Sequence, residues 1–120
     1  MDELTSSPDS ASWATKRRFP RFRLETHVIV TELRSGITRA VKGWSRDVCE
    51  GGLGGMVAEG LNADDEVLVE FPLPSARQQL LLRARVHRHS SSHYGFEFLQ
   101  TTPAVLRDIR QACQMLPIQK

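Results

Sequence analysis

The sequence predicts a single all-β domain of six short antiparallel strands, arranged as a barrel or sandwich, followed by one amphipathic helix. Three observations support this prediction. Six short segments alternate apolar and polar residues, clusters of turn residues separate them, and apolar residues at helical spacing appear only after residue 101. A chain of 120 residues has room for one domain, and the apolar stripe of the helix is expected to cover a face or an opening of the strands.

The predicted strands are bounded by turn residues, and Ser35 and Gly36 join the first two. They cover residues 24–33, 37–45, 56–58, 66–71, 79–88 and 94–99. In the fifth strand the alternation puts apolar side chains on one face and polar ones on the other: Leu80, Leu82, Ala84 and Val86 against Arg83, Arg85 and His87. Thr102 and Pro103 suit a helix N-cap and first turn, and apolar residues follow at helical spacing up to Leu116.

Both ends of the chain are predicted to lie outside the domain. Residues 1–15 are polar and show no period, which predicts a disordered tail with Trp13 as a singly exposed aromatic residue. The domain is expected to span residues 16–116, and residues 117–120 to form a second tail. The N-terminal residues are acids and serines where a signal peptide needs an apolar core, and no apolar run has membrane-spanning length, so we expect a cytoplasmic protein.

Neither a metal site nor an enzyme active site is predicted. Cys49 and Cys113 lie far apart without CxxC spacing, which argues against a disulfide framework and a cysteine zinc site. Three histidines at the end of a predicted strand lack a nearby carboxylate or cysteine partner, so we expect surface residues: His87, His89 and His93. Asp64, Asp65 and Glu66 are expected in a turn rather than a calcium site, and no motif marks a catalytic nucleophile.

The strongest local feature is a basic cluster at residues 16–23, in which five of eight residues are Lys or Arg. The formal net charge of +2 is too small to indicate nucleic acid by itself. Arginine forks bind phosphate or the O6/N7 edge of guanine, and they stack on base faces. The cluster therefore suits a small anionic ligand with exposed bases, and suits RNA or an anionic membrane surface almost as well.

The second feature is the glycine-rich stretch at residues 47–55, DVCEGGLGG. It is not a phosphate-binding P-loop, because no Gly-Lys-Ser/Thr follows it. It is not a dinucleotide-binding turn either, because such a turn is followed by a long helix and this stretch is not. Glycines let a ligand approach the backbone closely. Asp47 can accept hydrogen bonds from a guanine Watson–Crick edge or hold an arginine in place.

Together, these segments resemble the PilZ domain family, whose signature is RxxxR before the first strand and [D/N]xSxxG some tens of residues later. Arg17 and Arg21 supply the first motif, and the segment from Asp47 to Gly52 supplies the second, with Cys49 where the family has serine. The segment YGFEF at 94–98 is similar to the closing strand of the family. The resemblance spans about residues 16–116 and includes the trailing helix.

The resemblance implies a six-stranded antiparallel β-barrel of the split-barrel type that holds cyclic di-GMP on its outer surface. Arg17 and Arg21 would grip guanine edges and phosphates, and Asp47 would read guanine donors. Cys49 would offer a polar contact, and Gly52 would leave room for the backbone to touch the ligand. The implied ligand-binding residues are Arg17, Arg18, Arg21, Asp47, Cys49 and Gly52. Arg18, like Lys16, stands at a position where family members differ.

The function that follows is a receptor with no catalytic activity and no cofactor, acting as a monomer or weak dimer. A disordered arm at residues 16–23 would fold over cyclic di-GMP, and arm and ligand together would be seen by a protein partner. The alternative is an adaptor for motility or pilus machinery that does not bind the nucleotide. The intact RxxxR argues against an adaptor, and the cysteine argues mildly for it. An RNA-binding small barrel is a third reading, and it predicts affinity for long polyanions.

Overall fold

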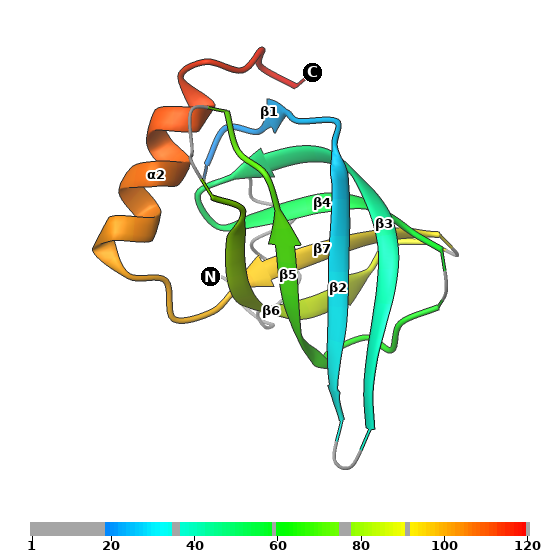
Figure 1. Cartoon of the computed structure of the whole chain (residues 1–120). Helices are drawn as coiled ribbons and strands as arrows, with labels where there is room; N and C mark the ends of the chain where they lie inside the picture. The colour runs from blue at the N-terminus through cyan, green and yellow to red at the C-terminus, as the bar shows by residue number, and fades with distance from the viewer. Residues whose placement is uncertain (1–18, 35–36, 59, 75–77, 91, 120) are drawn as a thin grey trace, which may run out of the picture.

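The structure is a computed structural model that describes residues 19–34, 37–58, 60–74, 78–90 and 92–119 (Figure 1). Its elements are β1 (Phe22–Arg23), β2 (His27–Arg34), β3 (Ile37–Cys49), β4 (Gly52–Val57), β5 (Glu66–Phe71), β6 (Leu80–Arg88), β7 (His93–Phe98) and α2 (Pro103–Cys113). The tail predicted at residues 1–15, with Trp13, and the candidate residues Lys16, Arg17 and Arg18 lie outside the described residues.

Six of the strands form a closed antiparallel barrel in the order β3-β2-β5-β6-β7-β4, and β4 pairs back onto β3. The length of β3 makes this possible. One of its edges pairs with β2 up to Trp44 and then with the short β1 at Asp47 and Val48, while the other edge pairs with β4. Closure removes the exposed edges that an open sheet would offer for aggregation. The predicted barrel with a C-terminal helix is confirmed.

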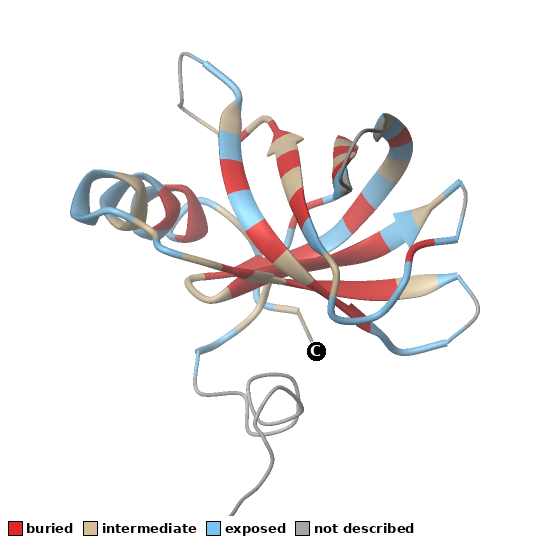
Figure 2. Cartoon of the chain, turned by 90° about the horizontal axis from the view of Figure 1, so that it is seen from below, coloured by how far each residue is buried: buried red, intermediate tan, exposed pale blue. Residues whose placement is uncertain are grey.

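The inside of the barrel is filled by alternate side chains, as Figure 2 shows by the banding of buried and lighter positions along the strands. The buried apolar side chains of four strands are Val28 and Val30, Val67, Val69 and Phe71, Leu82, Ala84 and Val86, and Tyr94, Phe96 and Phe98. Burial of each larger apolar side chain contributes roughly 1.5–3 kcal/mol. These side chains form the hydrophobic core inside the barrel, and the residues that alternate with them face outward.

The helix α2 lies against the side of the barrel (Figure 1). Thr102 caps its N-terminus, because Oγ1 accepts a hydrogen bond from the Val105 amide at 3.2 Å. The buried face carries Ile109, Ala112 and Cys113. Within the described residues no helix is long and apolar enough to span a membrane.

The C-terminal residues after α2 pair with the segment that leads into the barrel. The Arg23 amide donates to the Pro117 carbonyl at 2.8 Å, and the Gln119 amide donates to the Arg21 carbonyl at 2.8 Å. Phe22 and Ile118 form an isolated antiparallel bridge. Residues 117–119, expected as part of a tail, therefore lie alongside β1 and hold it in place.

Two strand boundaries differ from the prediction. The first long strand begins at His27 rather than residue 24, because the Leu24 amide donates to the Arg46 carbonyl and the chain crosses to β3 there. The stretch predicted as a glycine-rich connection, 46–55, instead forms the end of β3 and most of β4, and their ladder continues to Cys49 and Gly52. Glycine disfavours strands in isolation, but barrel closure overrides this preference.

Ser45 fixes the crossing between β1 and β2. Its side chain is buried, its hydroxyl donates to the Leu24 carbonyl, and it accepts from the Thr26 amide at 3.1 Å. Ser45→Ala leaves both backbone groups without this partner, so we expect the free energy of unfolding to fall by about 1–3 kcal/mol. Urea denaturation measures this loss, with the exposed Ser92→Ala as the control. An unchanged midpoint in Ser45→Ala would contradict this role.

Candidate functional site

A row of outward-facing positions crosses four strands of the barrel, and its two middle positions have no side chains. Asp47 of β3 pairs with Gly54 of β4, Gly54 pairs with Gly95 of β7, and Gly95 pairs with His87 of β6. These positions face outward because the residues that alternate with them, such as Val48 and Phe96, are buried in the core.

In the next outward row, Gly52 pairs with Cys49 on one side and with Glu97 on the other. We call Gly52, Gly54 and Gly95 the glycine floor. Asp47 and His87 stand at its two ends, three strand spacings or about 14 Å apart. The three glycines are buried, and a Cβ at Gly54 would meet the Asp47 carboxylate and Arg21, so a planar group reaches this backbone only by displacing side chains that cover it.

A β-bulge puts Asp47 on this outer surface. The pairing of β3 with β4 shifts between Ser45 and Asp47, so Arg46 is one extra residue in β3. Ser45 points inward to its buried hydrogen bonds, and strict alternation would point Asp47 inward as well. With the extra residue, Asp47 faces outward and Val48 fills the core.

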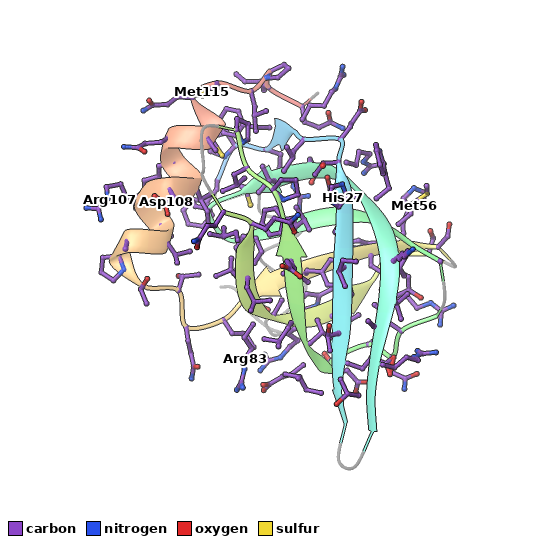
Figure 3. All side chains as sticks on the ribbon, viewed as in Figure 1. His27, Met56, Arg83, Arg107, Asp108 and Met115 are labelled. Atoms are coloured by element: carbon purple, nitrogen blue, oxygen red, sulfur yellow. The ribbon has the colours of Figure 1, made fainter. Side chains whose placement is uncertain are left out.

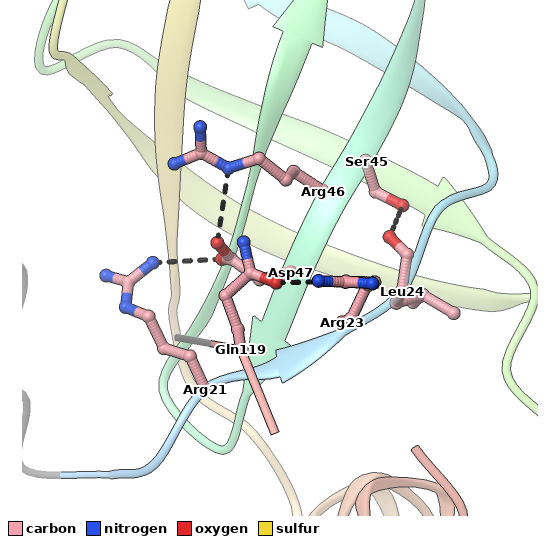
Figure 4. A network of polar contacts seen from close by, with 7 residues as sticks. All are labelled: Arg21, Arg23, Leu24, Ser45, Arg46, Asp47 and Gln119. Atoms are coloured by element: carbon pink, nitrogen blue, oxygen red, sulfur yellow. Dashed lines mark hydrogen bonds and ion pairs between the residues drawn. The ribbon is translucent and has the colours of Figure 1, made fainter. Parts of the chain in front are cut away.

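Two arginines bind the carboxylate of Asp47 (Figure 4). Arg21 Nη1 donates to Oδ1 at 2.9 Å, and Arg46 Nε lies 3.6 Å from Oδ2. The Asp47 side chain is only 3% exposed and that of Arg21 15%, so this contact is shielded from water, whereas Arg46 is 59% exposed. Arg21 is therefore oriented over the β3–β4 ladder by a charge-assisted hydrogen bond.

Gly54 gives the carboxylate its room. A Cβ at this position would lie 2.8 Å from Asp47 Oδ1 and 3.6 Å from Arg21 Nη1. A side chain there would push the carboxylate off its arginine. Any residue other than glycine at position 54 is therefore incompatible with this contact as it stands.

The family of the chain follows from its sequence match. The family model of the PilZ domain matches residues 15–114. The chain belongs to the PilZ domain family. No match was found among curated proteins.

Solved structures of PilZ domains have this fold. The PilZ domain of YcgR from Escherichia coli, solved with c-di-GMP, has a TM-score of 0.69 at 16% identity, covering 85% of this chain and 92% of that one. The PilZ domain of CeSA from a cellulose-synthesizing bacterium has a TM-score of 0.60 at 18% identity, covering 79% and 95%. The Bacillus subtilis inhibitor of motility, MotI, has a TM-score of 0.64 at 17% identity, covering 82% of this chain and 50% of that one.

In this PilZ domain, four of the six residues proposed from the sequence come together. Arg21, Asp47, Cys49 and Gly52 all lie at the junction of β1, β3 and β4. The other two, Arg17 and Arg18, precede the described residues. Sequence reasoning missed Gly54, Gly95 and Glu97, because only cross-strand register places them beside the motif.

The last part of the predicted disordered arm, residues 16–23, is ordered in the structure. Phe22 and Arg23 are strand residues paired with β3, and Arg21 is held by Asp47 and by the Gln119 amide. The ring of Phe19 lies over Gly51, where an added Cβ would be 3.3 Å from it. The expectation of a wholly disordered arm is therefore wrong for residues 21–23.

Cys49 occupies an outward position yet is buried. Burial raises the pKa of its thiol, and hydrogen bonds from the Gly51 and Gly52 backbone and the charge of Arg21 oppose this rise. Burial likewise raises the pKa of Cys113 to about 11, with smaller contributions from Cys49 and Glu50. Both thiols are thus protonated at neutral pH, which does not suit a nucleophile.

Of the three histidines predicted as surface residues, only His87 departs from the prediction, because His89 is exposed and His93 is half-buried. His87 is buried, and its Nε2 lies 2.9 Å from Oε1 of Glu97, so it has the carboxylate partner that the sequence did not reveal. Partial desolvation lowers the pKa of the exposed His89, and nearby positive charges, first that of Arg21, add to this effect. Among the described residues, no group of three or more His, Cys, Asp or Glu could hold a metal ion.

A separate cavity of about 500 Å³ lies between the arm, α2 and the C-terminal residues. Its walls are mainly apolar and include Phe19, Phe22, Cys113, Leu116 and Ile118. Among the described residues of its lining, the charged groups are Glu50 and Arg110, and they neutralise each other across 3.0 Å. The glycine floor, with its flanking arginines, is therefore the better site for an anionic ligand.

Gly54→Ala tests the geometry of the site. We expect the added Cβ to displace the Asp47 carboxylate from Arg21 and to lower the free energy of unfolding by about 1–3 kcal/mol, the worth of a hydrogen bond to a charged group. Thermal unfolding measures the loss. Gly60→Ala is the control, because its Cβ would lie 3.9 Å from its nearest neighbour, Tyr94 Oη. Equal melting temperatures for both variants would show that Gly54 is not needed for this contact.

Proposed function

We propose that this PilZ domain is a receptor for cyclic di-GMP and that it holds the ligand on the glycine floor. The observation that carries the proposal is the ion pair of Arg21 with Asp47 beside Gly54, because it joins the arginine motif to the glycine-rich motif at one place. The fold of the YcgR domain that was solved with c-di-GMP supports it. So does the family, since PilZ domains are binding domains, and we propose no catalysis.

The chemistry of the site matches that of the ligand. The Asp47 carboxylate accepts hydrogen bonds, and the Watson–Crick edge of guanine offers N–H donors. A guanidinium carries five N–H donors in a planar fork, which suits phosphate oxygens or the O6/N7 edge of guanine. Arg21 is held in advance by Asp47, which lowers the entropy cost of binding.

The arm upstream of Phe19 would complete the site. Arg17 and Arg18 are the remaining basic ligands that we propose, and they would close over cyclic di-GMP bound beside Arg21 and Asp47. Cys49 and Gly52, at the start of the floor, would contribute a polar contact and an open stretch of backbone. The closed arm and its ligand would form the surface that a cytoplasmic protein partner recognises.

An adaptor that ignores the nucleotide is the second candidate. The shared fold of the Bacillus subtilis inhibitor of motility supports it, as does the cysteine in place of the motif serine. Its fold would present the same barrel to a partner, but the glycine floor would have no ligand. Calorimetric titration with cyclic di-GMP separates the two functions, and a single-stranded RNA in a parallel titration tests for a general polyanion binder.

Arg21→Ala tests the receptor function. We expect the unmodified protein to bind cyclic di-GMP with a Kd near micromolar, about −8 kcal/mol. Arg21→Ala should weaken binding by about 2–4 kcal/mol, because it removes a charge-assisted contact to the ligand, and Arg17→Ala should do the same. Isothermal titration calorimetry measures both losses.

Arg107→Ala is the control for these variants, because it removes the same charge from the exposed side of α2, as Figure 3 shows. Its affinity should equal that of the unmodified protein. If Arg21→Ala binds as tightly as Arg107→Ala, the ligand lies elsewhere. If no protein in the series binds cyclic di-GMP, the receptor function is wrong.

Cys49→Ser restores the residue that the motif has at this position. A hydroxyl can accept the hydrogen bonds that the Gly51 and Gly52 amides make to the thiol, so we expect little change in melting temperature. It also makes a stronger hydrogen bond than sulfur does, so affinity for cyclic di-GMP should rise by up to about tenfold, or roughly 0.5–1.5 kcal/mol.

Cys113→Ser is the matched control for this substitution. Cys113, the last residue of α2, belongs to the buried core, so serine there should lower the melting temperature and leave the affinity unchanged. Calorimetric titration and thermal unfolding of both variants give the comparison. A lower melting temperature with unchanged affinity in Cys49→Ser would mean that this side chain also serves only for packing.

A further inference from the structure

Two large apolar side chains stand exposed on the outer surface of β3 and β4. Trp44 of β3 is 53% exposed and Met56 of β4 is 45% exposed, and the two residues are cross-strand partners. Figure 3 shows the Met56 side chain on the outside of the barrel. Residues directly opposite each other on antiparallel strands have Cβ atoms about 4.5–5.5 Å apart, so Met56 is placed to support the indole of Trp44 from one side.

This Trp44–Met56 pair lies in the outward row next to the candidate site. Met56 follows Gly54 by two residues on β4, so the two positions share a face and are about 6.6 Å apart along the strand. On β3, Trp44 is the outward residue before the bulge, and Asp47 is an outward residue after it. The exposed indole and the Asp47 carboxylate therefore lie on one continuous surface.

Arg46 connects the Trp44–Met56 pair to the carboxylate. It stands between Trp44 and Asp47 in β3, and its Nε lies 3.6 Å from Asp47 Oδ2. Arg21 donates to the other carboxylate oxygen, and the two guanidinium groups reach Asp47 from different sides (Figure 4). The Arg46 side chain is 59% exposed, so a ligand can reach its guanidinium from solvent. The outer surface of β3 thus presents an indole, a guanidinium and a carboxylate in succession.

These three groups match the parts of a cyclic dinucleotide that Arg21 leaves unbound. Cyclic di-GMP has two guanines, and one carboxylate can read the Watson–Crick edge of only one of them. The second base therefore needs another partner on the protein. An aromatic ring beside a cation is the arrangement with which proteins bind single-stranded nucleotides, because the ring stacks on the base and the cation pairs with the phosphate. An indole that is more than half exposed offers such a ring without first being uncovered.

We propose that Trp44 is a further ligand-binding residue of this domain, and that its indole stacks on the second guanine of cyclic di-GMP while Asp47 and Arg21 hold the first. The inference rests on the proposed receptor function. Arg46, between the two base positions, would pair with a phosphate of the ligand. Met56 would keep the indole in place beside it.

Two substitutions at one position test the stacking by calorimetric titration. Trp44→Ala removes the ring and should weaken binding of cyclic di-GMP about fivefold or more. Trp44→Phe keeps a ring face, and its Kd should stay within about threefold of that of the unmodified protein. Leu81→Ala is the matched control, because Leu81 is also a large apolar residue, 59% exposed, but stands at the other end of β6 from the candidate site. Its Kd should equal that of the unmodified protein.

Tryptophan fluorescence tests the contact with the ring still in place. The chain contains two tryptophans, Trp13 and Trp44, so Trp13→Phe leaves Trp44 as the only one. A guanine stacked on an indole quenches its emission. On titration with cyclic di-GMP, the emission of Trp13→Phe should fall, with the same Kd that calorimetry gives for this variant.

The outcomes separate this inference from the receptor function. If the unmodified protein does not bind cyclic di-GMP, the receptor function is wrong and the inference ends with it. If it binds but Trp44→Ala has the same Kd, or the emission of Trp44 does not change, the receptor function stands and the role of Trp44 is overturned. A loss in Trp44→Phe or in Leu81→Ala as large as that in Trp44→Ala would also overturn stacking, because the ring face at this position would then not be what matters.

Discussion

The β-bulge at Ser45–Asp47 is the constraint on which the candidate site depends. One additional residue in β3 reverses the facing of everything that follows it, so that Ser45 is inside, Asp47 outside and Val48 inside. An uninterrupted strand would bury the carboxylate in the apolar core, where an unpaired charge is costly. The bulge instead places Asp47 under Arg21, and the floor starts from there.

The close approach of β3 and β4 around the bulge accounts for the glycines. A Cβ at Gly55 would lie 2.4 Å from the Trp44 carbonyl oxygen, and a Cβ at Gly43 would lie 2.4 Å from that of Met56. Gly43 and Gly55 allow the backbones of β3 and β4 to approach each other, whereas Gly54 leaves room for the Asp47 carboxylate. Glycines that look alike in the sequence thus have two purposes, one structural and one in the site.

The arm couples the site to the rest of the domain. Arg21 faces Asp47, while its neighbours Pro20 and Phe22 line the apolar cavity against α2. The C-terminal residues close the arrangement, since Arg23 Nε donates to Gln119 Oε1 at 3.3 Å and the backbone of both segments is paired (Figure 4). The same short segment therefore borders the candidate site on one side and the apolar cavity beside α2 on the other.

The sequence by itself determined the order of the elements, the alternation that fills the core, and the two motifs that identify the family. These depend on local patterns: Leu82, Ala84 and Val86 alternate with polar residues, and Thr102 with Pro103 starts the helix. Only the tertiary structure decided that Gly54, Gly95, His87 and Glu97 border the motif residues. Their contacts join strands through register, and register depends on the bulge and on barrel closure, which no local pattern encodes.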